Sequence, residues 1–133
     1  MKHLKSILFT FSLITGNLIL AQQIKGFDVG TLLKSLNNSI DNVEGVTLDS
    51  SKRAKFENVN KLFSNNLTDF LTDYDSRSKR ENTVYLNEIF NKREDDLEHL
   101  FGNDVYKKYR KSTKKTLKKT KRKVKTSVIK SIL

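Results

Sequence analysis

The pattern that decides the fold is clearest at residues 56–74, which read FENVNKLFSNNLTDFLTDY. Apolar side chains recur there at steps of three and four residues, the spacing that places them on one face of an α-helix. They are Phe56, Val59, Phe63, Leu67, Phe70 and Tyr74, with Leu62 and Leu71 beside them. Asp49 precedes the segment and is typical of an N-cap, because its carboxylate can accept from free backbone N–H groups. The pattern predicts a helix over residues 50–74.

The same spacing predicts three further helices, over residues 29–42, over 79–100 and from 103 to the C-terminus. Asp28 is a candidate N-cap for the first, and Gly102 is a natural C-cap for the 79–100 helix. Arg93 falls on or near the apolar stripe of that helix. Strict alternation is rare and no Asn-Gly or Asp-Gly turn is present, so no strand is expected. The prediction is an all-α fold, an elongated hairpin of three to four amphipathic helices with a long basic C-terminal helix.

Composition limits what the chain can be. It has 133 residues, 36% of them hydrophobic and 31% charged, and it contains no cysteine, proline or tryptophan. The missing cysteines exclude a disulfide scaffold, a thiolate metal site and a cysteine nucleophile. The low apolar share favours one small, thin domain with little deep core.

The N-terminal segment 1–21 has the pattern of a secretory signal peptide. Lys2 and Lys5 form a positively charged start, and an apolar run follows over residues 7–21. That run is shorter than the roughly 20 residues that a membrane span needs. We therefore expect an exported protein, periplasmic or secreted, with cleavage after Ala21; the alternative is an uncleaved membrane anchor.

Charge divides the remaining chain into two parts. Residues 22–104 carry 11 basic and 15 acidic side chains, a net charge of −4, whereas residues 105–133 carry 13 basic side chains and no acidic one. The pattern indicates a mildly acidic body with a strongly basic C-terminal arm. We expect a helical domain over 22–111, followed by a basic helix or tail over 112–133.

Two stretches resemble the Spy/CpxP-like periplasmic proteins, which carry a repeated Leu-Thr-x-x-Gln element at helix starts. They are VTLDSSKRAKF at 46–56 and REDDLEHLFGNDVYKKY at 93–109. Residues 48–52 stand in for the first copy, with Asp49 in place of threonine and Lys52 in place of glutamine. Residues 101–105 lie where the second copy would fall. The resemblance implies an all-helical, often dimeric, cradle-like envelope protein that binds partly unfolded clients without ATP or takes part in envelope-stress sensing.

Two sets of residues are candidates for binding. The aromatic and apolar stripe could hold a client protein, although side chains at this spacing are more often core residues. The candidate client-binding residues are Phe56, Phe63, Leu67, Phe70 and Tyr74. The basic C-terminal segment could be a solvated tail, could bind an anionic polymer or lipid surface, or could fold back on the acidic domain. The candidate anion-binding residues are Lys107, Lys108, Arg110, Lys111, Lys114, Lys115, Lys118, Lys119, Arg122 and Lys123.

Nothing in the sequence points to catalysis. Residues 22–133 contain one histidine, His99. Asp95 lies on the same helix face one turn earlier, but two ligands are too few for a tight metal site. No nucleophile elbow and no glycine-rich phosphate loop are present. Because the basic run is mostly lysine, sequence-specific nucleic-acid recognition is not expected. We predict a non-enzymatic protein without metal or cofactor that binds clients or an anionic envelope surface. A structural module without ligand and a homodimer are options that the sequence leaves open.

Overall fold

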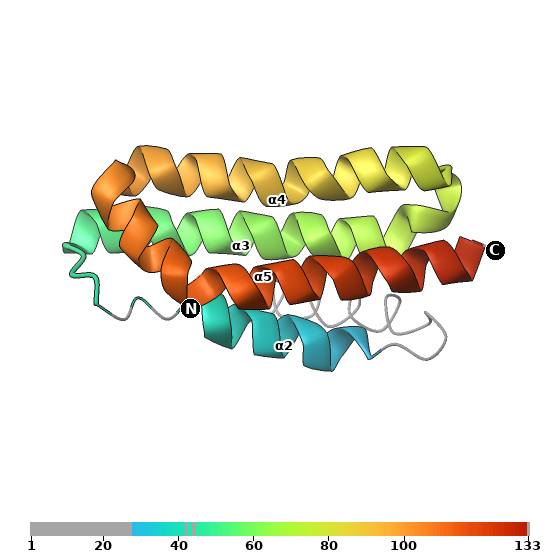
Figure 1. Ribbon diagram of the computed structural model, residues 1–133, viewed down its shortest axis with the longest axis horizontal. Helices are drawn as coiled ribbons and strands as arrows, with labels where there is room; N and C mark the ends of the chain where they lie inside the picture. The colour runs from blue at the N-terminus through green and yellow to red at the C-terminus, as the bar shows by residue number, and fades with distance from the viewer. Residues whose placement is uncertain (1–27, 42, 44, 133) are drawn as a thin grey trace, which may run out of the picture.

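The computed structural model describes residues 28–41, 43 and 45–132, and this part of the chain is helical without strands (Figure 1). The helices are α2 (Val29–Ile40), α3 (Ser50–Asp73), α4 (Lys79–Phe101) and α5 (Asn103–Ile132), with a short 3-10 turn at Tyr74–Ser76. The all-α fold expected from the sequence is confirmed. The expected signal peptide at 1–21 lies outside the described residues.

The four helices pack side by side as one antiparallel bundle. Helices α3 and α4 form a hairpin, α5 lies along α4, and the shorter α2 closes the arrangement by contacting both α5 and α3. Figure 1 shows α5 descending from the end of α4 and then running beside α2. The expected helical hairpin is therefore present, and two further helices pack along it.

Local sequence chemistry sets where the helices begin and end. Asp28 accepts from the backbone N–H of Thr31 at 3.0 Å, and Asp49 accepts from that of Lys52 at 2.8 Å, as expected for N-caps. Gly102 separates α4 from α5 with φ of +76°, a value that a residue without Cβ adopts readily. The structure adds a reciprocal cap that the sequence analysis did not assign: Ser78 and Glu81 each bond the other's backbone N–H at the start of α4.

The core is deeper than the composition suggested. The larger of two apolar clusters receives side chains from all four helices, and a smaller one lies at the end of the bundle where α4 meets α5. The larger cluster comprises Leu33, Leu36, Ile40, Phe63, Leu67, Phe70, Leu71, Leu86, Ile89, Phe90, Leu117, Val124 and Val128. The smaller comprises Phe56, Leu97, Phe101, Tyr106 and Tyr109. The prediction of a thin body with little deep core is therefore wrong, because four narrow apolar stripes converge on a shared interior.

A buried arginine joins the two clusters. The guanidinium of Arg93 lies over the rings of Phe63 and Tyr109, 5.5 and 5.6 Å from their centroids. It donates to Asn60 Oδ1 at 3.0 Å, to Glu94 Oε1 at 2.8 Å and to the hydroxyl of Tyr109. Among the described residues no buried side-chain nitrogen or oxygen lacks a hydrogen-bond partner. We call Asn60, Arg93, Glu94, Tyr106 and Tyr109 the Arg93 network.

The basic C-terminal segment is not a free tail. Its boundary with the helical domain, expected at 111/112, falls inside the continuous helix α5. Leu117, Val124 and Val128 are buried against the other helices, because the narrow apolar stripe of α5 docks along the bundle and leaves the lysines outside. Among the described residues, no helix is both long and apolar enough to cross a membrane.

Candidate anion-binding surface

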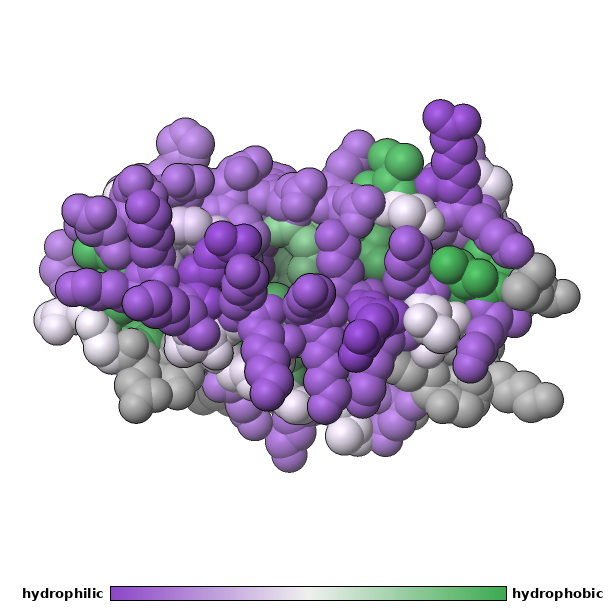
Figure 2. Space-filling model, in the orientation of Figure 1, coloured by the Kyte–Doolittle hydropathy of each residue, from purple (hydrophilic) through white to green (hydrophobic). Residues whose placement is uncertain are grey.

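All ten residues expected to bind anions lie exposed on α5. The helix is 30 residues long, which corresponds to about 45 Å. Tyr109, Thr113, Leu117 and Val124 fix its rotation by turning inward, and the basic residues therefore occupy the other sides of the helix. Figure 2 shows hydrophilic side chains over most of the visible face of the molecule, with apolar atoms in recesses and at a few isolated points.

The positive charge of α5 is not neutralised by the protein itself. The ion pairs in the described part of the chain join Arg77 to Asp73, Lys92 to Asp96, and Arg93 to Glu94, and none involves a basic residue of α5. Helix α5 is thus held to an acidic body by apolar contacts and by the hydrogen bonds of Tyr106 and Tyr109, while its ammonium groups stay available to an outside partner. The sequence left three options for the basic segment: a solvated tail, an anion-binding element, or a segment that folds back on the acidic domain. The apolar stripe of α5 does fold back on that domain, and the basic side chains stay exposed.

A groove of about 230 Å³ runs between α4 and α5 at one edge of this surface. Its lining residues are Phe90, Asn91, Glu94, Arg110, Lys114, Leu117, Lys118 and Lys121. Lys121 was not among the predicted anion-binding residues. It is half-buried, and its Nζ lies 5.6 Å from the centroid of the Phe90 ring. Its position in the sequence, four residues after Leu117 on the border of the apolar stripe, could have indicated that it lies beside the core.

The predicted client-binding residues do not form a surface. Phe56, Phe63, Leu67 and Phe70 are at most 2% exposed and belong to the core clusters. Tyr74 is half-buried in the 3-10 turn that follows α3. Of the two interpretations of this stripe, core and client surface, the burial supports core, because α4 and α5 cover the stripe that a two-helix hairpin would have left open.

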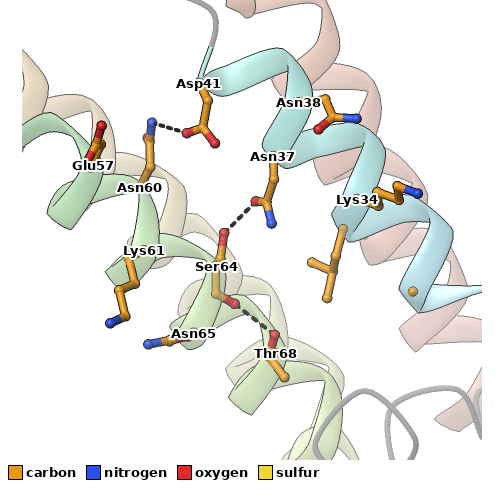
Figure 3. A pocket seen from close by; sticks show the side chains of 12 residues that line it. Lys34, Asn37, Asn38, Asp41, Glu57, Asn60, Lys61, Ser64, Asn65 and Thr68 are labelled. Atoms are coloured by element: carbon orange, nitrogen blue, oxygen red, sulfur yellow. Dashed lines mark hydrogen bonds between the residues drawn. The ribbon is translucent and has the colours of Figure 1, made fainter. Parts of the chain in front are cut away.

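A second groove, about 520 Å³ in volume, lies between α2 and α3. Figure 3 shows its polar lining, in which Ser64 donates to Asn37 at 2.6 Å and Asn60 donates to Asp41 at 3.0 Å. These bonds link the two helices across the groove. Lys34 and Lys61 are balanced there by Asp41 and Glu57, so this groove lacks the excess positive charge of the α5 surface.

The acidic end of α4 does not gather metal ligands. The ring Nδ1 of His99 lies 2.8 Å from the backbone oxygen of Asp95, which occupies one of the two ring nitrogens. Within the described residues, no group of three histidine, aspartate or glutamate side chains is placed to hold a metal ion.

Comparison of the chain with protein-family models, with curated protein sequences and with solved structures gives no match. The resemblance to the Spy/CpxP-like proteins stays a prediction.

Proposed function

We propose that the protein is a non-enzymatic binder of anionic surfaces and that α5 is its binding element. The observation that supports this proposal is the set of exposed lysines and arginines on a docked, folded helix without ion pairs to the acidic body. Each basic residue near a negatively charged membrane surface contributes about 1 kcal/mol to binding. A helix carrying many such residues is sufficient for stable adsorption.

The mode of binding follows from where the apolar stripe lies. A free amphipathic helix inserts its apolar face among lipid acyl chains, but the apolar face of α5 is occupied by the bundle, with Val124 and Thr113 at most 1% exposed. Binding is therefore electrostatic, and the protein stays at the membrane surface without inserting into it. Binding falls steeply with salt, because screening weakens contacts between exposed charges.

Vesicle co-sedimentation tests the proposal. The chain without the expected signal peptide, beginning at Gln22, is mixed with phosphatidylcholine vesicles that contain or lack phosphatidylglycerol. It should sediment only with the anionic vesicles, and raising the salt from roughly 50 to roughly 200 mM should weaken binding at least about tenfold. Equal binding to both kinds of vesicle, or binding that salt does not change, would contradict the proposal.

A matched pair of variants separates α5 from overall charge. One variant replaces four exposed lysines of α5 with glutamine, and the other replaces four exposed lysines of α3 and α4. The first set is Lys111, Lys115, Lys119 and Lys123, and the second is Lys52, Lys55, Lys61 and Lys79. Both variants have the same net charge. The α5 variant should bind at least about tenfold more weakly than wild type, and the other should stay within about twofold.

Capture of partly unfolded proteins, the other function expected from the sequence, has less support. The aromatic side chains that would hold a client lie in the core, and the exposed large apolar residues of the described chain are Leu62 and Val84, on different helices. Client capture thus requires the helices to part. Suppression of the aggregation of a reduced, unfolding protein would support it, and no suppression at severalfold molar excess would argue against it.

A further inference from the structure

We infer that the groove between α4 and α5 binds the phosphate monoester headgroup of an anionic lipid. This inference rests on the proposed function and gives the basic surface a specific site. Arg110, Lys114 and Lys121 point to an anion, since they follow one another at steps of four and seven residues along the wall that α5 gives to the groove.

The groove carries a net positive charge even though a carboxylate lies in its wall. Glu94 already accepts from the buried guanidinium of Arg93 at 2.8 Å and from the hydroxyl of Tyr106. Its negative charge is therefore balanced from inside the bundle. The cations on the α5 side are left without a carboxylate partner among the described residues.

Lys121 is the residue that most needs a partner. Its side chain is half-buried in the groove wall, where loss of hydration disfavours a positive charge. Burial, together with the nearby Lys125, lowers the pKa of Lys121. The ring face of Phe90 gives the ammonium group some stabilisation at 5.6 Å. A bound anion would supply the remaining charge compensation.

The rest of the lining determines the class of anion. The guanidinium of Arg110 can present two parallel N–H groups to phosphate oxygens, and several cations close together favour a dianion over the singly charged diester of most phospholipids. Phe90 and Leu117 add apolar surface to the groove. That surface suits the glycerol and first methylene groups of a lipid, and it offers nothing to free inorganic phosphate.

The test compares two triple variants with equal loss of charge. The groove variant is Arg110→Gln, Lys114→Gln and Lys121→Gln. The control variant is Lys108→Gln, Lys115→Gln and Lys119→Gln, three exposed positions of α5 outside the groove lining. Binding is measured to vesicles containing phosphatidic acid and to vesicles containing phosphatidylglycerol, adjusted to the same surface potential. Melting curves confirm that both variants fold.

Wild type should bind the phosphatidic acid vesicles at least about fivefold more tightly than the phosphatidylglycerol vesicles. The groove variant should lose this preference. The control variant should keep it, while binding both kinds of vesicle more weakly than wild type. Equal preference in the two variants would overturn the inference and leave the proposed function standing. Failure of wild type to bind either vesicle would overturn both.

Calorimetry with soluble probes identifies the source of the phosphate. Dihexanoyl phosphatidic acid should bind at least about tenfold more tightly than inorganic phosphate, because only the former contacts the apolar part of the groove. Equal affinity for the two probes would overturn the assignment to a lipid headgroup.

Discussion

Arg93 is 2% exposed, and its guanidinium donates to side chains from α3, α4 and α5. Tyr109 extends these bonds to α2, because its hydroxyl donates to the backbone oxygen of Ile40 at 2.5 Å. That oxygen lies at the C-terminal end of α2, where helix carbonyls lack intrahelical partners and carry partial negative charge. One positive charge thus connects all four helices.

Replacing Arg93 with methionine should destabilise the protein by about 3 kcal/mol. Methionine fills similar space but leaves Asn60 Oδ1 and the Tyr109 hydroxyl without their donor in the interior. The measurement is urea unfolding followed by circular dichroism. The control is Lys92→Met on the neighbouring residue, whose ammonium is exposed and paired with Asp96 at 3.0 Å; it should cost less than about 1 kcal/mol. Equal losses in the two variants would contradict the role assigned to the network.

The two tyrosines of the network make stability sensitive to alkaline pH. Burial raises the pKa of Tyr109 above its ordinary value, and burial together with the hydrogen bond to Glu94 raises that of Tyr106. Because the folded state favours the neutral form of each tyrosine, the shift contributes its full amount to the free energy of unfolding below the ordinary tyrosine pKa of about 10. That contribution is lost as the pH rises through the folded pKa.

Tyrosinate absorbance should therefore appear late in an alkaline titration, together with unfolding. In the double variant Tyr106→Phe and Tyr109→Phe, this late rise in tyrosinate absorbance should be missing. The double substitution also removes three hydrogen bonds, so the comparison is made on the shape of the titration and not on its midpoint. A wild-type titration that is complete before any loss of helicity would contradict the raised pKa values.

At the scale of the element, the break between α4 and α5 depends on Gly102. Its φ of +76° is combined with a ψ of 161°, a region of backbone space that is essentially restricted to glycine. A Cβ added there meets no atom within 4 Å, so any cost of substitution comes from the backbone itself.

Both Gly102→Ala and Gly102→Asn should destabilise the protein by about 1–3 kcal/mol. Asparagine, which tolerates the left-handed helical region, should not rescue the turn, because the ψ at this position lies outside that region. Thermal unfolding of the two variants measures the effect. A clear advantage of asparagine over alanine would show that the residue adopts the left-handed helical conformation instead.

The helices themselves could be predicted from sequence because their causes are local. The predicted starts at 50, 79 and 103 coincide with those of α3, α4 and α5. Asp49 caps its helix as expected, and Gly102 has the expected positive φ. The apolar spacing of α5 also identified its buried side. How the helices assemble could not be predicted in the same way, because periodicity shows which face is apolar but not what covers it.

The candidate site shows the same limit. The exposure of the ten predicted basic residues follows directly from the position of the apolar stripe. Lys121 lies at the edge of the stripe, and only the approach of α4 and Phe90 makes it part of a groove. Phe63 and Phe70 could be core or binding surface from sequence alone, and their burial depends on contacts across the bundle.

At the scale of the whole molecule, charge is separated into a cationic helix and an acidic body. Helix α5 carries 13 basic side chains and the acidic Asp104, whereas residues 22–102 carry 11 basic and 14 acidic side chains, a net charge of −3. Such a separation orients a protein as it approaches a charged surface. Under the proposed function, this separation would turn α5 toward the lipid headgroups of an anionic membrane and the acidic body away from them.

Because the same helix supplies both the charge and part of the core, the two roles require different variants. Removing residues 114–133 deletes the buried side chains of Leu117, Val124 and Val128, each worth about 1.5–3 kcal/mol of burial. Their sum approaches the 5–15 kcal/mol of total stability that is typical of a domain. The truncated chain should therefore lose cooperative thermal unfolding, measured by circular dichroism.

The four-lysine α5 variant, Lys111→Gln, Lys115→Gln, Lys119→Gln and Lys123→Gln, should melt within a few degrees of wild type, because these side chains are exposed and glutamine is about as good a helix former as lysine. A truncated chain that melts as sharply as wild type would show that the distal half of α5 does not hold the bundle together. If the truncated chain is unfolded, as we expect, its loss of vesicle binding is uninformative, since an unfolded chain also loses its surface. The four-lysine variant is therefore the one that measures what the charges of α5 contribute.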